Sequence, residues 1–493
     1  MIVIINPPLV SLRGDILGSG IPYIPVSMAY LAAYIRSKGH TIQVIDGFGS
    51  SPKKKSFSQT HLFQGLSVEE IVAEIPEHLT AIFLYAGNVI SHTILLQIIR
   101  TIRKKYDEPI ILFENTQAVT AYSLVRVAND FLDAGATIVL SGEAEARIDS
   151  LLKALKGELS LHEVDGATFR DAGKTITVPK KIFFDALDDL PFPAWDLLPM
   201  KNYWALGYSH GPLSSKTYLP ILTSRGCPYG CKYCVVPETN SRRWRFRTAK
   251  NVVDEFEHNM KLFGVQEFHW EDLNPTIRKD RMIEISKEIL NRKLNIQWKI
   301  VAGTKVETLD KDVISWMAKA GCTYISISPE SGSPKVLKLM DKPFNHELAI
   351  TLVNHMNTLH VAMQACFVLG FPGETSEDLQ LTKKYVHKLA RAGVDEIALF
   401  IMTPIPGSEQ YLTVKGFPSL DQLTFSPSWR QDYIMLHKFR KVLYLQFHLL
   451  KMLYHPFKAV LQPVHIFRRK FVTKTEMAVY RYFQMYLQRG DAQ

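Results

Sequence analysis

Three of the five cysteines of this chain lie close together, in the segment SRGCPYGCKYC. Cys227 is followed after three residues by Cys231 and after two more by Cys234. Clustered cysteines in a loop with Gly and Pro indicate a metal site in a reducing compartment rather than a disulfide framework. A mononuclear zinc site usually needs four protein ligands, and no fourth Cys or His follows at finger-like spacing. A [4Fe–4S] cluster held by three cysteines leaves one iron open for a small ligand, and this chemistry fits the spacing best.

The first 150 residues, which must help to position such a site, alternate short apolar runs with helical patterns. Continuous apolar strands separated by amphipathic helices are typical of a parallel sheet covered on both faces. We therefore expect an α/β, doubly wound, flavodoxin-like domain over residues 1–156, with its ligand over the carboxyl ends of the strands. The expected strands are 2–6, 41–46, 81–86, 109–114 and 137–143.

A second series of strand and helix units follows a Pro-rich segment. Residues 157–215, with a hairpin-like stretch around Gly173 and the segment LPFPAWDLLPM, are predicted to form a linker. Six units within 216–410 predict a partial (β/α)6 barrel, in which catalytic groups gather at strand ends. The expected barrel strands are 218–226, 265–272, 296–303, 322–328, 362–370 and 396–402. Residues 411–493 are predicted to be helical, aromatic and basic.

Composition and terminal patterns limit the class of protein. Apolar residues are 46% and charged residues 22% of the chain, which excludes a disordered chain and a polytopic membrane protein. The uncharged stretch 78–99 is long enough to cross a bilayer, but Gly87 and Asn88 in its middle favour a strand, a turn and a helix. The N-terminus has no basic region and is broken at Pro7 and Pro8, so we expect a core strand and a cytoplasmic protein.

The net charge of +10 is concentrated in the tail. From Arg430 onward there are 12 Lys and Arg against 3 Asp and Glu, whereas the first 429 residues have 46 against 45. Because the body is balanced, nucleic acid is not expected as a partner. The apolar runs of the tail are too short to cross a bilayer but suit a basic amphipathic helix. A helical cap on the barrel, a peripheral membrane contact and a docking face for an acidic partner all stay open.

The cysteine spacing, with Tyr233 directly before the last cysteine, resembles that of the radical S-adenosylmethionine (SAM) superfamily. SPESGSPKVLKLMDK (328–342), FVLGFPGET (367–375) and TPIPGSEQY (403–411) are similar to its subgroup with an N-terminal cobalamin-binding domain, the class B methyltransferase-like group. PYIPVSMAYLAAYIRSKGHTIQVID, SGEAE and LPFPAWDLLP carry the same likeness in the first domain and linker. The resemblance covers most of residues 1–411 and is specific to the subgroup, not to one substrate.

The resemblance implies roles for residues of the barrel. Cys227, Cys231 and Cys234 would hold the [4Fe–4S] cluster, where SAM is cleaved to a 5′-deoxyadenosyl radical. The other implied SAM-binding residues are Tyr233, Glu330, Ser331, Gly370, Gly373 and Glu374. A helix N-cap by Ser331 or Ser333, with Pro334 at the first helical position, explains this segment equally well, and a tight strand-to-helix turn explains the two glycines.

Other polar and sulfur-containing residues on the barrel strands have weaker assignments. Glu271 and Asp272 end another strand and could bind SAM or substrate. His269 is expected to be a core or barrel-lining residue. Cys322 and Cys366 are expected to be buried structural thiols.

In the first domain the resemblance implies a cobalamin site. The Asp-x-His-x-x-Gly motif is absent from this chain, and the subgroup normally lacks it too. Asn88, Ser91, Gly142 and Glu143 are the expected contacts by position. Where the family usually has a Gly-Gly pair, this chain has Glu114 and Asn115, and we expect their side chains to crowd or replace a cobalamin contact. The alternative that the first domain no longer binds cobalamin therefore remains.

The leading hypothesis is a cobalamin-dependent radical SAM enzyme that methylates an unactivated carbon of a small-molecule or lipid-like substrate. Its expected partners are that substrate and an electron donor such as flavodoxin or ferredoxin, with a peripheral membrane contact through the C-terminal region. One alternative is a radical SAM cyclase or rearrangement enzyme of the same architecture. The other is a cobalamin- or cluster-based sensor.

Overall fold

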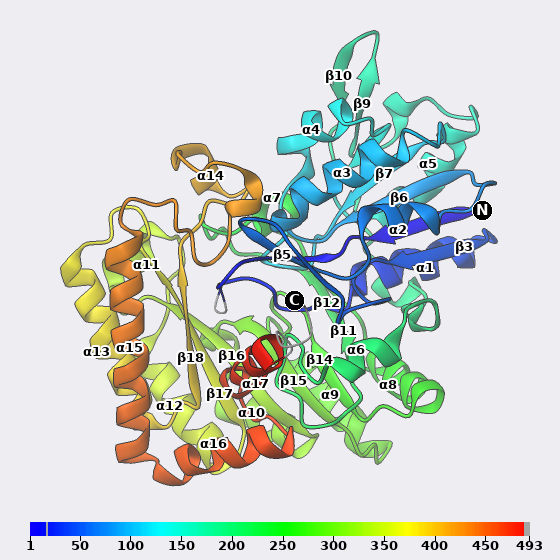
Figure 1. The fold of residues 1–493 in the computed structure, drawn as a ribbon. Helices are drawn as coiled ribbons and strands as arrows, with labels where there is room; N and C mark the ends of the chain where they lie inside the picture. Colours follow the sequence, from blue (N-terminus) through cyan, green and yellow to red (C-terminus); the bar gives the residue numbers. More distant parts are fainter. Residues whose placement is uncertain (16–17, 488–493) are drawn as a thin grey trace.

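The computed structural model describes residues 1–15 and 18–487, which form two large sheets with a helical C-terminal region (Figure 1). The first sheet has the strand order β10-β9-β8-β7-β6-β1-β3, and the second has the order β11-β14-β15-β16-β17-β18. Figure 1 shows the first sheet in blue and cyan at the upper right, and the second in green and yellow below it. The α/β class with two sheets and a helical tail is therefore confirmed.

The first domain is built on five parallel strands in flavodoxin-like order. β3, β1, β6, β7 and β8 pair in parallel, which is the order 2-1-3-4-5 when the parallel strands are numbered along the chain. These strands are β1 (Ile2–Asn6), β3 (Ile42–Asp46), β6 (Ala81–Ala86), β7 (Ile110–Glu114) and β8 (Ile138–Leu140). The helices of this part are α1 (Val26–Ser37), α2 (Val68–Ala73), α3 (His92–Ile102), α4 (Ala128–Asp133) and α5 (Ile148–Leu155). Every expected strand is present, and the central strands β1, β6 and β7 are apolar runs buried on both faces, whereas the edge strand β3 is only partly buried.

The hairpin that the sequence placed in the linker extends this first sheet. β9 (Ala167–Asp171) pairs antiparallel with β8, and β10 (Lys174–Thr177) pairs with β9. Ala172 and Gly173 between them have φ of 45° and 77°, as a two-residue hairpin turn with the twist of its strands requires. The hairpin is thus part of the first sheet, and α6 (Met200–Leu206) follows in the connection to the second.

The second sheet is an open parallel barrel-like sheet whose strands follow one another in chain order. They are β11 (Leu219–Ile221), β14 (Glu267–Trp270), β15 (Gln297–Thr304), β16 (Cys322–Glu330), β17 (Ala362–Leu369) and β18 (Glu396–Ile401). The connecting helices are α8 (Ala249–Phe263), α9 (Lys279–Asn291), α10 (Lys311–Lys319), α11 (Pro334–Leu339), α12 (His346–Thr358) and α13 (Ser376–Ala392). β11 and β18 form the two edges of the sheet, as a partial barrel of six units requires.

Two small sheets were not expected from the sequence. The single strand expected over 218–226 divides into β11 and β12 (Ser224–Gly226), and β12 pairs antiparallel with β13 (Trp244–Phe246). The division occurs because the buried carboxylate of Asp272 accepts hydrogen bonds from the backbone N–H groups of Thr223 (3.1 Å) and Ser224 (2.5 Å). β2 (Leu9–Leu12), β5 (His61–Gln64) and β4 (Lys55–Phe57) form the other small sheet, next to the carboxyl edge of the first domain.

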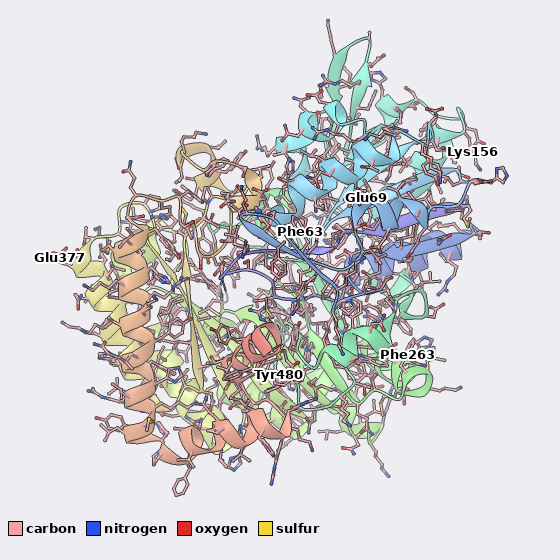
Figure 2. The ribbon with its side chains drawn as sticks, viewed as in Figure 1. Phe63, Glu69, Lys156, Phe263, Glu377 and Tyr480 are labelled. Carbon is pink, nitrogen blue, oxygen red and sulfur yellow. The ribbon has the colours of Figure 1, made fainter. Side chains whose placement is uncertain are left out.

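The C-terminal region is helical and packs on the barrel. After α14 (Glu409–Thr413), it consists of α15 (Tyr433–Tyr454), α16 (Pro456–Arg468) and α17 (Lys474–Leu487). The Lys474 amide donates to Glu396 on β18 (2.9 Å), and the Phe471 amide donates to the carbonyl of Leu213 (2.6 Å). The segment that begins α17 is thus bound both to β18 and to the segment before β11. Figure 2 labels Tyr480, which lies on α17, below the centre of the view. None of the described helices combines the length and apolar character needed to cross a bilayer.

A buried cluster of charges joins the first domain to the β12–β13 hairpin. Glu143 and Glu145 follow β8, while Arg225 lies on β12 and Arg245 on β13. Arg245 contacts both carboxylate oxygens of Glu143 at 2.6 and 2.8 Å, and Arg225 contacts Glu145 at 2.9 Å. Burial raises the pKa of Glu143, but Arg225 and Arg245 outweigh it and hold that pKa below its usual value. The carboxylate is therefore charged at neutral pH, and it fixes the β12–β13 hairpin on the first domain.

Replacing Glu143 with Ala is expected to lower the free energy of unfolding by about 3–5 kcal/mol, because it leaves buried guanidinium groups without a counter-charge. The contribution of Glu143 is present above its unfolded pKa of about 4.3 and is lost as the pH falls below it. Urea denaturation of the full chain measures the change. As a matched control, Asp133→Ala removes the exposed ion pair with Arg170 and should cost less than about 1 kcal/mol. Equal losses in the two variants would contradict the structural role of Glu143.

Candidate active site

A cavity of about 740 Å³ lies where the carboxyl edge of the first sheet faces the barrel. Its size is within the range of small-molecule and cofactor sites. The first domain contributes Asn6, Tyr85, Asn88, Ser91, Asn115 and Gln117 to the lining. The barrel contributes Cys227, Tyr233, Cys231, Cys234, Glu271 and Glu330, and α17 contributes Lys474, Met477 and Ala478. Residues distant in the sequence thus surround one space.

The cysteine loop begins directly after β12 and is held from both sides. A Cβ at Gly226 (φ 81°) would lie 2.0 Å from the carbonyl oxygen of Arg243, so only glycine fits where the chain turns from β12 into the loop. The Gly226 amide donates to Gln117 of the first domain (3.2 Å), and the Lys232 amide donates to the carbonyl of Met340 (3.0 Å). The loop is therefore fixed by the first domain as well as by the barrel.

All three thiols of the loop are half-buried and line the cavity. Burial raises the pKa of Cys227 to about 11 and also raises the pKa of Cys231, while Lys342 and Lys305 act in the opposite direction. Burial outweighs the two cations, which reduce but do not reverse the rise in these pKa values. Among the described residues, no three His, Cys, Asp or Glu side chains are arranged around a single metal ion. In a four-iron cluster each cysteine binds a different iron, so convergence on one point is not needed.

Glu330, at the end of β16, accepts hydrogen bonds from Tyr233 (2.9 Å) and from the ammonium group of Lys342. Glu330 and Lys342 are both buried and both line the cavity. Burial lowers the pKa of Lys342, but the attraction of Glu330 and Cys231 outweighs it, so Lys342 is charged. Glu330 has a left-handed backbone (φ 62°), a strained conformation that is common at functional sites. Carboxylate, ammonium and phenol groups thus meet beside the cysteine loop.

The remaining expected SAM-binding residues do not line the cavity. Ser331 is fully buried, and its hydroxyl pairs with Thr382 (3.1 Å) and accepts from the amide of Ser333 (3.1 Å), which makes it a turn residue. Gly370 and Gly373 have φ of 74° and 86° and form a tight turn after β17. Glu374 accepts from the Gly370 amide, and burial raises the pKa of this carboxyl to about 7.

Two carboxylates that follow β14 have different roles. Glu271 lines the cavity and pairs with His210 at 2.7 Å, while the ammonium group of Lys474 lies 3.2 Å from the other ring nitrogen of His210. Attraction to His210 overcomes the effect of burial and lowers the pKa of Glu271. Asp272 instead holds the chain between β11 and β12 through its bonds to Thr223 and Ser224. Glu271, His210 and Lys474, from three separate segments, therefore form a polar cluster at the barrel end of the cavity.

His269, Cys322 and Cys366 are all buried, as expected from the sequence. His269 is buried beside Glu267 (2.9 Å), away from the cavity lining. Cys322 is buried on β16, and Cys366 pairs with Ser326 at 3.5 Å. Cys366 also reaches the cavity wall.

At the first domain, Asn88 and Ser91 line the cavity, whereas Gly142 and Glu143 do not. Glu143 belongs to the buried charge cluster, and a Cβ at Gly142 would lie 2.6 Å from Lys180 rather than in the cavity. The expected crowding by Glu114 is not found. Its buried carboxylate turns away and accepts hydrogen bonds from the backbone amides of Leu124 (3.1 Å) and Gly142. Of the two residues Glu114 and Asn115, only Asn115 lines the cavity. Its side chain accepts a hydrogen bond from the Ser27 hydroxyl and donates one to the carbonyl of Gly87.

Several functional candidates were missed by the sequence analysis. They are Lys305, Lys342, His210 and Lys474. Lys342 lies inside the segment 328–342 that carried the resemblance, so its position was a usable signal. His210 and Lys474 gave no signal, because they meet only when the linker and α17 fold against the barrel.

Comparison with known proteins finds a family match over part of the chain and relatives over most of it. Residues 221–386 match the Radical SAM superfamily. The chain is 26% identical to an uncharacterized methyltransferase of Pyrococcus horikoshii, covering 87% of this chain and 85% of that one. It is 24% identical to cytidylyl-2-hydroxyethylphosphonate methyltransferase of Streptomyces wedmorensis, covering 88% and 85%. It is also 25% identical to the anaerobic magnesium-protoporphyrin IX monomethyl ester cyclase of a Synechocystis species, covering 73% and 68%.

A solved structure extends the likeness beyond the matched domain. The fold resembles that of the radical SAM methyltransferase TsrM from Kitasatospora setae, solved with cobalamin and a [4Fe–4S] cluster bound. The TM-score is 0.62 at 15% identity, over 83% of this chain and 73% of that one. This likeness concerns the fold alone. Residues 221–386 are therefore similar to the Radical SAM superfamily, and the chain as a whole has a fold like that of a cobalamin-binding member of it.

Proposed function

We propose that this chain is a cobalamin-dependent radical SAM methyltransferase that transfers a methyl group to an unactivated carbon of a small-molecule substrate. One observation carries the proposal: a single cavity connects the three cysteines with the carboxyl edge of the flavodoxin-like sheet. In open α/β sheets, ligands bind at that edge. The methyltransferase names of two relatives support the reaction type.

The described residues fit both cofactors. Cys227, Cys231 and Cys234 would hold the cluster, with Lys305 and Lys342 to balance its negative charge. At the first domain Glu114 is turned away, so Asn115 and the Gly87 backbone leave the edge open to cobalamin. When bound, the cluster supplies one electron to SAM, and cobalamin supplies a carrier for the methyl group.

The chain itself binds and orients the reactants. Glu330 and Lys342 offer a carboxylate and an ammonium group that match the amino and carboxylate groups of SAM. Glu271, His210 and Lys474 are placed to bind a polar group of the substrate at the barrel end of the cavity. Met477 and Ala478 of α17 add an apolar wall that excludes water from a reactive radical. A one-electron donor such as flavodoxin or ferredoxin completes the proposal.

Methyl-labelled SAM tests the proposed reaction directly. Because the relatives include a cytidylyl-2-hydroxyethylphosphonate methyltransferase and a magnesium-protoporphyrin IX monomethyl ester cyclase, candidate phosphonates and tetrapyrroles are the first substrates to supply. Label in the substrate, together with 5′-deoxyadenosine, is the expected result. 5′-Deoxyadenosine with a ring-closed, unlabelled product would instead identify the cyclase alternative.

Replacing any one cysteine of the loop with Ala is expected to abolish bound iron and SAM cleavage, since only three protein ligands are available to the cluster. Iron content and 5′-deoxyadenosine formation after anaerobic reconstitution measure the loss. Cys366→Ala is the matched control, because this thiol also lines the cavity but lies on β17. The control should keep its iron. Loss of iron in the control, or retention in Cys231→Ala, would refute the assignment.

Glu330→Gln is expected to raise the KM for SAM by about tenfold or more, because it removes a charged partner from the polar group beside the cysteines. Ser331→Ala changes the next residue, which faces Thr382 instead of the cavity, and should change the KM by less than about twofold. Steady-state kinetics of SAM cleavage provide both values. A larger effect at Ser331 than at Glu330 would reverse the assignment of the two residues.

A further inference from the structure

Helix α15 has two apolar faces, and only one of them is packed. Leu436, Leu443 and Phe447 are buried against the barrel side, where α15 contacts α13 and β18. A second row follows the same helical spacing on the outside and is exposed. This row consists of Val442, Leu445, Leu449, Met452 and Leu453. Because a surface helix needs only one apolar face to pack, packing on the barrel does not account for the outer row.

Helix α16 continues this exposed surface. It has no buried residue along its length. Phe457 is 84% exposed and Phe467 is 90% exposed, although aromatic side chains are usually buried. Val460, Leu461 and Val464 lie between them at helical spacing and are also exposed. We call the two exposed rows together the apolar strip. Figure 1 shows α15 in orange on the left of the view and α16 in orange-red at the lower edge.

The exposed charges on the two helices of the apolar strip have one sign. From Tyr433 to Thr475 the sequence contains no Asp or Glu. Of the basic residues in this stretch, Arg440 and Lys451 are buried and donate to the carbonyls of Phe425 and Asp395, so they do not contribute to the surface. The exposed ones lie near the two ends of the strip. They are Lys438, Lys441, Arg468, Arg469 and Lys470.

We propose that the apolar strip docks this protein on the surface of an anionic lipid bilayer, with α15 and α16 lying in the interface. Apolar side chains flanked by cations, without acids, are complementary to acyl chains and anionic headgroups. A second copy of the chain fits less well, because a two-fold dimer through the strip would bring its own cations together without acids to pair with them. The proposal is independent of the reaction that the cavity catalyses.

Vesicle co-sedimentation of the full chain tests the docking surface. We expect binding to phosphatidylcholine vesicles that contain phosphatidylglycerol, little binding to phosphatidylcholine alone, and weaker binding at high salt. The variant Leu453→Gln/Phe457→Gln/Phe467→Gln should lower binding by about tenfold or more. Lys441→Gln/Arg468→Gln/Lys470→Gln should remove the preference for anionic vesicles.

A control variant removes three exposed apolar side chains elsewhere on the surface. Phe57, Leu262 and Leu412 are 54%, 59% and 62% exposed and lie outside the strip, so their replacement by Gln should leave vesicle binding within about twofold. Circular dichroism checks that each variant folds. Failure of the wild-type chain to bind anionic vesicles, or equal losses in strip and control variants, would overturn the proposal. So would light scattering that shows a dimer lost in the strip variant without any vesicle binding, because the strip would then contact a second copy.

Discussion

The buried pairing of Glu143 and Glu145 with Arg225 and Arg245 is the constraint on which the active site depends. The two carboxylates follow the last parallel strand of the first sheet, and the two guanidinium groups lie on the β12–β13 hairpin. Cys227 comes directly after β12. By fixing the hairpin, the charge cluster fixes the start of the cysteine loop against the carboxyl edge of the first domain. Neither domain alone would enclose the cavity.

Carboxylates inside the barrel complete the positioning. Asp272, which follows β14, binds the chain between β11 and β12 and so separates the two strands. Glu330 binds both Lys342 and Tyr233 beside the cysteines. At the other end Glu396 holds the start of α17, which then forms part of the cavity wall. The C-terminal region therefore has two distinct surfaces. Its inner surface shapes the cavity, and its outer surface carries the apolar strip.

Sequence patterns predicted the parallel strands and the cysteine loop for clear physical reasons. Strands buried on both faces are continuous apolar runs, and three closely spaced cysteines in a loop with Gly and Pro are typical of a metal site. The same patterns could not show which charges would pair across domains. Glu143 was therefore interpreted as a cofactor contact although it belongs to the charge cluster, and Glu114 was expected to point into the cavity. Net charge was also incomplete as a guide, since Arg440 and Lys451 are buried against backbone carbonyls.

The central claim is that one cavity serves both a cluster at the cysteine loop and cobalamin at the edge of the first sheet. The most direct test is anaerobic reconstitution of the full chain with iron, sulfide and cobalamin, followed by gel filtration and quantification of iron and corrinoid on the same chain. The account predicts that a [4Fe–4S] cluster and cobalamin elute together with the protein in equimolar amounts. A chain that retains the cluster and SAM cleavage but binds no corrinoid would contradict it.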